Sequence, residues 1–508
     1  MADEKGVGLR GWLTGPRRKT PIGQPEVEKL VPLDKHRIAV LPMTNISPDP
    51  QDEYFAEGIT DELISTISKI PELHVVARTS SEKYKGSGKG ISEISQELRI
   101  GSILEGTVRK AGNQLRVTAQ LIDSQTEESL WSESYDREFG DVFNIQTDIA
   151  RKVAEGLKIQ LHSGHQRYQK KPTENSEAYT HYLKGRYIWN RGMLEYEKTL
   201  SQFELAIQKD PDFALGYSAL AETYLLMSRN GYVAPQLGYP KATEFARKAI
   251  SIDETLAEPY TVLATIRQEY EWKWDEAQMG FRRAIELNPS YATAHAWYAL
   301  YLGHVGRCEV GIGEAKRAIE LDPLGPRGLQ SLSEEYLFAH QYDKAIEAAE
   351  TLIELSPESG ISYRFRAVAE VEKGMYDEAI ADFQKAGKQF GPEVPVGGLI
   401  GRLGHAYAIS GRISDANRIL HELENQPVLA GPDSRFIPTA NRAMKIGLVH
   451  IGLGNEQLAL EWLDKAADER TAEIIHLKCE PIFSSIRGAP GYRALLRKIG
   501  LDNSNLEK

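Results

Sequence analysis

Cysteine is scarce in this chain of 508 residues, which has only Cys308 and Cys479. The two lie far apart and outside any C-x-x-C pattern, which excludes a disulfide scaffold and predicts a reducing, cytoplasmic compartment. No run of about 18 apolar residues occurs, and residues 1–23 lack the apolar core of a signal peptide. We therefore expect a soluble protein without direct membrane insertion.

Dense basic clusters are also missing, and the formal net charge is −11. A nucleic-acid surface needs clustered Lys and Arg to neutralise phosphates, so no nucleic-acid partner is expected. The chemical motifs are incomplete. The glycines around Lys89 suggest a phosphate loop, but Lys83 stands where that pattern needs a glycine, and His162 and His165 have no further metal ligand nearby in sequence. We predict no catalytic residues, no metal and no cofactor.

A helical hairpin recurs at a fixed interval between residues 258 and 424. Equivalent positions in successive units lie 34 residues apart, and they are Ala284, Ala318, Leu352, Ala386 and Leu420. Three units end in AIELNP, AIELDP and LIELSP, in which proline stops a helix,. This interval is the tetratricopeptide period. One earlier unit is longer, since 43 residues separate Ala206 from Ala249, and we place its extra residues in the turn-rich stretch 229–235,.

The residues before the repeats alternate between strand and helix patterns. Short apolar runs predict strands at 37–42 and 73–77, and helical spacing of apolar residues predicts helices at 59–70, 91–98 and 142–157. Between these helices, apolar residues alternate with period two through 104–121, which predicts a hairpin around Gly112, and a third strand is expected at 130–135. The fold class expected is an α/β N-terminal domain followed by an all-α tetratricopeptide superhelix, an α-solenoid.

Two stretches of this first domain carry a family resemblance. RIAVLPMTNISPDPQDEYFAEGITDELISTISKIPELHVVARTSSEKYKG and ILEGTVRKAGNQLRVTAQLIDSQTEESLWSESYDREFGDVFNIQTDIA resemble the TolB amino-terminal-like (FlgO-like) domain of bacterial regulatory proteins. The resemblance implies that tetratricopeptide repeats follow, and that an output module such as a winged helix, nucleotide cyclase or kinase often precedes. About 35 residues precede the domain, so we expect the effector to be encoded separately.

The expected organisation has five parts. Residues 1–35 form a flexible tail, 36–165 the TolB-like domain, 166–175 a linker, 176–470 about eight helical hairpins, and 471–508 a C-terminal cap and tail. An irregular loop is expected at 427–435. The terminal stretch beginning at Trp462 resembles the end-of-group segment that closes such arrays, and an open stack needs a cover for its apolar end.

In a tetratricopeptide stack, the first helix of each hairpin lines a concave groove that suits an extended peptide or a helix. The 34-residue register gives eight groove-facing candidates: Thr261, Thr265, Gln268, Thr293, His304, Gln330, Glu334 and Arg364. We expect Trp297, Tyr298 and Tyr336 to pack rather than bind. The pattern favours a non-catalytic scaffold or adaptor in bacterial signalling with a protein or peptide partner. Alternatives are a ligand sensor, whose α/β domain binds a small molecule, and an enzyme. The pattern fixes no oligomeric state.

Overall fold

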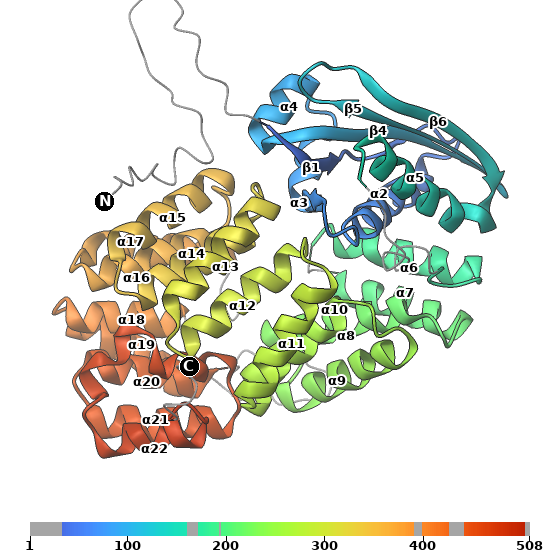
Figure 1. The fold of residues 1–508 in the computed structure, drawn as a ribbon. Helices are drawn as coiled ribbons and strands as arrows, with labels where there is room; N and C mark the ends of the chain where they lie inside the picture. Colours follow the sequence, from blue (N-terminus) through green and yellow to red (C-terminus); the bar gives the residue numbers. More distant parts are fainter. Residues whose placement is uncertain (1–32, 160–170, 193–194, 391–398, 426–440, 503–508) are drawn as a thin grey trace, which may run out of the picture. The chain divides into compact units, whose positions relative to one another are not determined.

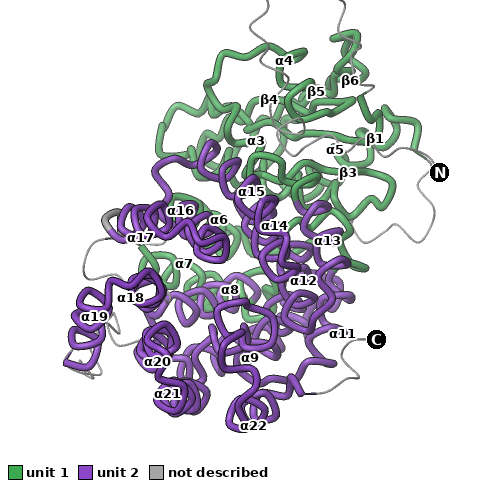
Figure 2. The backbone as a smooth tube through the Cα atoms, turned by 90° about the vertical axis from the view of Figure 1, so that its left-hand side faces the viewer, with its two compact units in different colours: residues 1–217, 285–292, 319–325 green, residues 218–284, 293–318, 326–508 purple. Residues whose placement is uncertain are grey.

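The structure is a computed structural model that describes residues 33–159, 171–192, 195–390, 399–425 and 441–502 (Figure 1). The tail up to residue 32, residues 160–170 and the expected irregular loop 427–435 lie outside the described residues. The chain forms two compact units (Figure 2). Unit 1 holds residues 1–217, 285–292 and 319–325, and unit 2 holds residues 218–284, 293–318 and 326–508.

Unit 1 is organised on a mixed sheet with strand order β3-β1-β4-β5-β6. The parallel part joins β1 (Asp34–Val40) to β3 (His74–Val75) and to β4 (Ile100–Ala111). The antiparallel part joins β4, β5 (Gln114–Asp123) and β6 (Ser129–Glu138). These strands confirm the predicted ones. A further short strand, β2 (Thr44–Asn45), lies outside the predicted strands and pairs with β4.

The β4–β5 hairpin follows from the period-two pattern. Leu104, Val108 and Val117 are fully buried, while Ala111 pairs with Gln114 across a two-residue turn. Gly112 in that turn has φ of 60°, a conformation that a side chain disfavours,. The described domain also contains the predicted helices α2 (Glu53–Ile67), α4 (Ile91–Leu98) and α5 (Val142–Gly156), with the short α3 (Arg78–Ser81), η1 (Pro50–Asp52), η2 (Glu82–Tyr84) and η3 (Phe139–Asp141) between them.

The first helical hairpin belongs to unit 1. It consists of α6 (Ser176–Trp189) and α7 (Tyr196–Lys209). Tyr179 on α6 lies edge-on to Phe143 of α5 with ring centroids 4.6 Å apart, and its hydroxyl accepts a hydrogen bond from Gln146 at 3.1 Å. Leu183 on α6 lies so close to Gly58 that a Cβ there would be 2.5 Å from Leu183 Cδ2. The compact unit therefore continues past residue 175.

Two of the proline-ended motifs also belong largely to unit 1. In AIELNP, Asn288 donates to Ser68 Oγ at 3.2 Å, and Ser290, directly after the motif, donates to the Leu73 carbonyl at 3.2 Å. In AIELDP, the Leu321 carbonyl accepts from the backbone N–H of Ala77 at 2.8 Å, and the Asp322 carboxylate accepts from Ser80 at 2.6 Å. These bonds satisfy backbone groups beside the short strand β3.

Seven further helix pairs follow among the described residues. They are α8 (Ala214–Arg229) and α9 (Pro235–Ile252); α10 (Glu258–Ile266), continued by the π-helical turn η6 (Arg267–Glu271), and α11 (Trp274–Leu287); α12 (Ala292–His304) and α13 (Cys308–Leu321); α14 (Pro326–Phe338) and α15 (Tyr342–Leu355); α16 (Gly360–Glu372) and α17 (Tyr376–Phe390); α18 (Leu399–Ile409) and α19 (Ile413–Asn425); α20 (Arg442–Gly452) and α21 (Glu456–Asp468). Two 3₁₀ helices, η7 (Ala472–Lys478) and η8 (Pro481–Ile486), and α22 (Pro490–Lys498) end the described chain.

The placement of the extra residues of the second pair was wrong. The loop between α8 and α9 takes few of them, because α8 has 16 residues and α9 has 18, against 13 and 14 in α12 and α13. Pro235 stands in the first turn of α9, where its missing N–H has no helical partner to lose,. The insertion therefore lengthens both helices as well as the loop.

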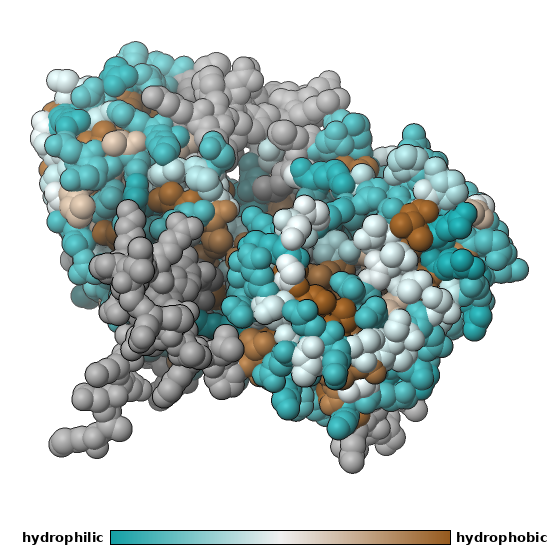
Figure 3. Space-filling model, turned by 90° about the horizontal axis from the view of Figure 1, so that it is seen from above, coloured by the Kyte–Doolittle hydropathy of each residue, from teal (hydrophilic) through white to brown (hydrophobic). Residues whose placement is uncertain are grey.

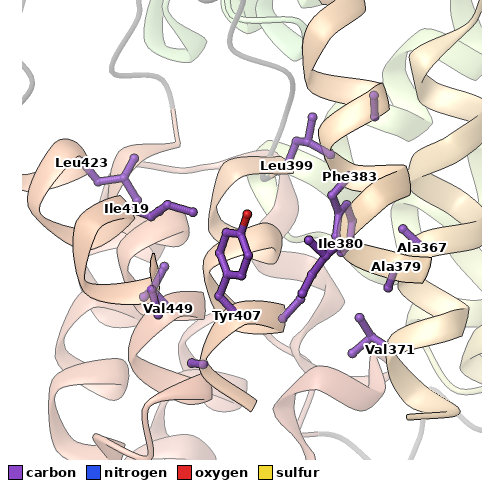
Figure 4. Packing of buried hydrophobic residues seen from close by; sticks show 14 of the residues in the cluster. Ala367, Val371, Ala379, Ile380, Phe383, Leu399, Tyr407, Ile419, Leu423 and Val449 are labelled. Carbon is purple, nitrogen blue, oxygen red and sulfur yellow. The ribbon is translucent and has the colours of Figure 1, made fainter. Parts of the chain in front are cut away.

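Small residues and aromatic rings hold consecutive pairs together. In the cluster formed by α16 to α20, Phe383, Ala386 and Ala379 on α17 are at most 1% exposed. The Tyr407 ring of α18 lies between Phe383 of α17 and Val449 of α20 (Figure 4). The outer surface is mixed, and on the face shown in Figure 3 apolar residues form small groups among hydrophilic ones. No helix among the described residues is long and apolar enough to span a membrane.

We expect Phe383→Ala to lower the free energy of unfolding of unit 2 by about 3–5 kcal/mol, because it leaves a cavity in this packed cluster. Met279, which is 70% exposed on α11, gives the matched control, and Met279→Ala should change stability by less than about 0.5 kcal/mol. Urea unfolding followed by circular dichroism measures both. Equal effects of the two substitutions would contradict the packing described.

Candidate partner-binding groove

Four of the eight predicted groove residues are buried. Thr261, Thr265, Gln268 and His304 are each at most 3% exposed. Both threonine hydroxyls donate to the carbonyl four residues earlier, Thr261 to Ala257 at 3.2 Å and Thr265 to Thr261 at 2.9 Å. Such bonds satisfy the hydroxyl within its own helix. The expectation that these four residues form an open surface was therefore wrong.

Two of the remaining candidates, Glu334 and Arg364, are in contact. Gln330 and Glu334 lie four residues apart on α14, which places them on one face of that helix,. Arg364 on α16 donates from Nη2 to Glu334 Oε1 at 3.3 Å, and both side chains are partly exposed. Thr293 is half-buried near the start of α12. Trp297, Tyr298 and Tyr336 are buried, as expected of packing residues.

Next to Glu334, Glu335 is completely buried. It faces two glycines, since a Cβ at Gly303 would lie 2.2 Å from its Oε1 and one at Gly311 2.1 Å from its Oε2. Burial, helped by the charge of Glu334, raises the pKa of Glu335 well above its usual value,. The two neighbouring glutamates therefore differ in exposure, and of the two only Glu334 is available to a partner.

Glu334 and Arg364 line a small hollow, which we call the Arg402 hollow, together with Phe338, Arg402, His476 and Glu480. Its volume of about 10 Å³ holds roughly one water molecule, far below the ~300 Å³ of a small-molecule pocket,. Glu334, Val368 and Arg402 lie 34 residues apart, and all three line it. The hollow is thus built from one register position on α14, α16 and α18.

A buried ion pair closes the base of the hollow. Arg402 is 3% exposed and Glu480 2%. Both guanidinium Nη atoms contact the carboxylate, Nη2 donating to Oε2 at 3.0 Å and Nη1 to Oε1. Burial would raise the pKa of Glu480, but the charge of Arg402 and hydrogen bonds from His476 and Arg402 outweigh it and hold that pKa well below its usual range,.

The C-terminal residues 470–486, which we call the closing segment, lie along several earlier repeats of unit 2. The Arg470 guanidinium lies 3.6 Å from the centroid of the Trp272 ring and donates to the Tyr270 carbonyl at 2.8 Å. Lys478 donates to the Val305 carbonyl at 3.3 Å. The closing segment therefore contacts η6 and the end of α12 as well as α18.

Two histidines meet beside the ion pair. The rings of His304 and His476 have centroids 4.8 Å apart, and Phe338 lies 5.7 Å from His304 and 5.9 Å from His476. Gln268 Nε2 lies 2.9 Å from His304 Nδ1. Burial, followed by the charges of His476 and Arg229, holds the pKa of His304 well below its usual value. His304 is therefore neutral near pH 7 and acts as a packing and hydrogen-bonding group.

Sequence reasoning missed Arg402, His476 and Glu480. The signal for Arg402 was present, because stepping the register by 34 from Glu334 reaches it through Val368. No such signal exists for His476 and Glu480, which lie beyond the last repeat in a stretch without periodicity.

Comparison with known proteins follows the division of the chain. Residues 34–152 match the family described as HilA/YgeH-like transcriptional regulator, second domain. Residues 332–393 match the tetratricopeptide repeat family. The chain carries tetratricopeptide repeats. The first match supports a regulator domain of the HilA type, and the TolB-like resemblance stays a prediction.

Two curated relatives each match about half of the chain. The chain is 34% identical over 249 residues to putative adenylate cyclase 3 of Rhizobium meliloti, covering 48% of this chain and 42% of that protein. It is 25% identical over 298 residues to the transcriptional regulator HilA of Salmonella typhimurium, covering 57% of this chain and 51% of that one. The chain thus spans about half the length of these relatives. A solved tetratricopeptide protein of Thermus thermophilus is 21% identical with a TM-score of 0.33, over 38% of this chain and 98% of its own.

We expect Glu480→Gln to destabilise unit 2 by about 3–5 kcal/mol near pH 7, because it leaves Arg402 buried without a countercharge. The folded-state pKa of Glu480 is depressed, so its contribution is present above the unfolded pKa near 4.5 and is lost as the pH falls through the folded value,. The difference between wild type and variant should narrow below about pH 4.

Urea unfolding at pH 7 and pH 3 measures that difference. The exposed pair of Asp415 and Arg418 gives the control, and Asp415→Asn should cost at most about 1 kcal/mol. If Glu480→Gln lowers the free energy of unfolding no more than Asp415→Asn does, the buried ion pair does not stabilise unit 2 and the prediction is wrong.

Proposed function

We propose that this protein is a non-catalytic interaction scaffold in a bacterial regulatory system, and that unit 2 binds a segment of a partner protein. The observation that carries the proposal is the contact of Glu334 on α14 with Arg364 on α16, both of which line the Arg402 hollow. Polar and charged groups on successive inner helices of a repeat array suit an extended peptide, because they can hydrogen-bond its backbone and its side chains. The hollow itself is too small to hold a cofactor or drug-sized ligand,.

The regulatory context rests on the relatives. One is named a transcriptional regulator and another a putative adenylate cyclase, and each shares about half its length with this chain. Matches to a protein named as a regulator and to one named as a cyclase support a regulatory role for the matched part of this chain. We therefore propose that the α/β domain and the repeats form a regulatory part.

The partner contact is tested by charge reversal. Glu334→Lys should lower capture of the partner from a native bacterial lysate at least tenfold, because it reverses a charge on the proposed surface and leaves Arg364 without its carboxylate. The full chain, immobilised, is the bait, and the captured protein is quantified by mass spectrometry. Glu354→Lys makes the same change at an exposed position of α15 and should capture as much partner as wild type.

A second variant separates binding from folding. The exchange Glu334→Arg with Arg364→Glu keeps an ion pair between α14 and α16 while inverting the charges offered to a partner. We expect this double variant to have the free energy of unfolding of the wild type and to have lost capture of the partner. Equal capture by wild type, Glu334→Lys and the exchanged pair would place the partner elsewhere on the molecule.

The scaffold proposal also predicts that the purified full chain forms no cyclic AMP from ATP and magnesium. A cyclase assay by chromatography, with an active cyclase added to a parallel sample as a positive control, measures this. Product formation above the buffer rate that scales with protein concentration would replace the scaffold by an enzyme.

A further inference from the structure

The closing segment has two faces with different roles. Its apolar side chains Ile474, Leu477, Phe483 and Ile486 are at most 2% exposed, and η8 packs on α20 while η7 packs beside α21 and η6. This face covers the end of the stack, as a repeat array requires. Its polar side chains instead reach back to earlier repeats of unit 2.

These polar contacts follow the order of the repeats along the chain. Arg470 contacts η6, Lys478 and His476 contact the end of α12, and Glu480 contacts α18. The contacts join side chains of the closing segment to backbone carbonyls, a ring and a guanidinium of three repeats. The closing segment makes them as two 3₁₀ helices, η7 and η8, with their flanking residues, and a bound segment of a partner can make contacts of the same kind,.

The strongest of these contacts specifies a chemical requirement. A guanidinium that is 3% exposed is costly to leave without a countercharge, so Arg402 needs a carboxylate in every well-populated state,. The Glu480 carboxylate accepts hydrogen bonds from both Nη groups of Arg402, whereas the buried Nε of Arg402 has no hydrogen-bond partner among the described residues. The planar guanidinium suits a bidentate carboxylate better than any other side chain.

We propose that the closing segment is an internal occupant of the partner site, and that a partner binds through an acidic peptide whose carboxylate replaces Glu480 on Arg402. The inference rests on the proposed scaffold function and names the chemistry of its partner. Exchange of one carboxylate for another leaves Arg402 paired before and after binding, whereas a neutral peptide would leave it buried and unpaired. The apolar face stays on α20 and α21 during the exchange, so the cap of the array is kept.

Cys479 can report on movement of the closing segment, because its side chain is only 7% exposed. Cys308 is the other thiol of the chain. Burial, with the charge of Glu480, raises the pKa of the Cys479 thiol well above its usual value, which slows its reaction in the closed state,. In the full chain with Cys308→Ser, the rate of maleimide labelling therefore measures how often the closing segment opens. The complementary Cys479→Ser chain reports on Cys308 and on global unfolding.

The probe is a synthetic peptide with the sequence of residues 473–483 and serine in place of Cys479, made with either glutamate or glutamine at position 480. The glutamate peptide at saturation should accelerate Cys479 labelling at least tenfold, and the glutamine peptide by less than a third of that factor. Labelling of Cys308 should stay within twofold throughout. Equal effects of the two peptides, or none from either, would overturn the proposal.

Variants of the chain give a second measurement that needs no peptide. Glu480→Gln should raise the Cys479 labelling rate at least tenfold with unchanged far-ultraviolet circular dichroism, and Asp468→Asn, an exposed acid paired with Lys498 at 2.7 Å, should leave it within twofold. If Glu480→Gln unfolds the array, Cys308 labelling rises equally, and the peptide experiment on wild-type Glu480 then decides.

The outcomes also separate this inference from the scaffold function. Capture of a lysate partner that depends on Glu334 but does not change Cys479 labelling keeps the scaffold and removes the internal occupant. Acceleration by the glutamate peptide without any captured partner keeps the internal occupant and counts against the scaffold function.

Discussion

A single helical hairpin cannot bury its own apolar face, and this constraint organises the repeats of this protein. Each pair needs a neighbour, which explains why alanines at the 34-residue interval, such as Ala284, Ala318 and Ala386, are at most 1% exposed. The last pair has no following neighbour. In place of another hairpin, η7 of the closing segment and α22 pack on α21, and η8 packs on α20. The need to end the stack thus brings Glu480 to Arg402.

Burial then decides which of the regularly spaced polar residues are exposed enough to contact a partner. Inner-helix positions look alike in sequence, yet Thr261 and Thr265 use their hydroxyls inside their own helix, while Glu334 and Arg364 remain partly exposed and pair with one another. Glu335, one position further along α14, turns toward Gly303 and Gly311. One residue of helical rotation, about 100°, separates a surface carboxylate from a buried one.

Sequence periodicity predicted the strands, helices and repeats well, because period two and the 34-residue interval report directly on which faces are buried. It failed where local pattern and tertiary contact diverge. The short strand at Thr44 exists only because β4 is long enough to pair with it after β1 ends. The hydrogen bond between Gln268 and His304 depends on how α10 and η6 meet α12, which no local pattern encodes. Arg402 could be reached through the register, whereas His476 and Glu480 could not.

Unit 1 is made of three separate parts of the sequence, and this limits the order in which the chain can fold. Its sheet and first hairpin are complete in sequence by Tyr217, yet Ala77, Ser80 and Leu73 find hydrogen-bond partners in residues 288–322. During synthesis from the N-terminus, these groups remain solvated until 73 to 105 further residues have emerged after Tyr217,. Helix pairs can fold through contacts between residues that are close in sequence, whereas unit 1 also needs residues 288–322, which are distant in sequence. A fragment that ends at the apparent domain boundary would therefore present an edge that the full-length protein never exposes to solvent.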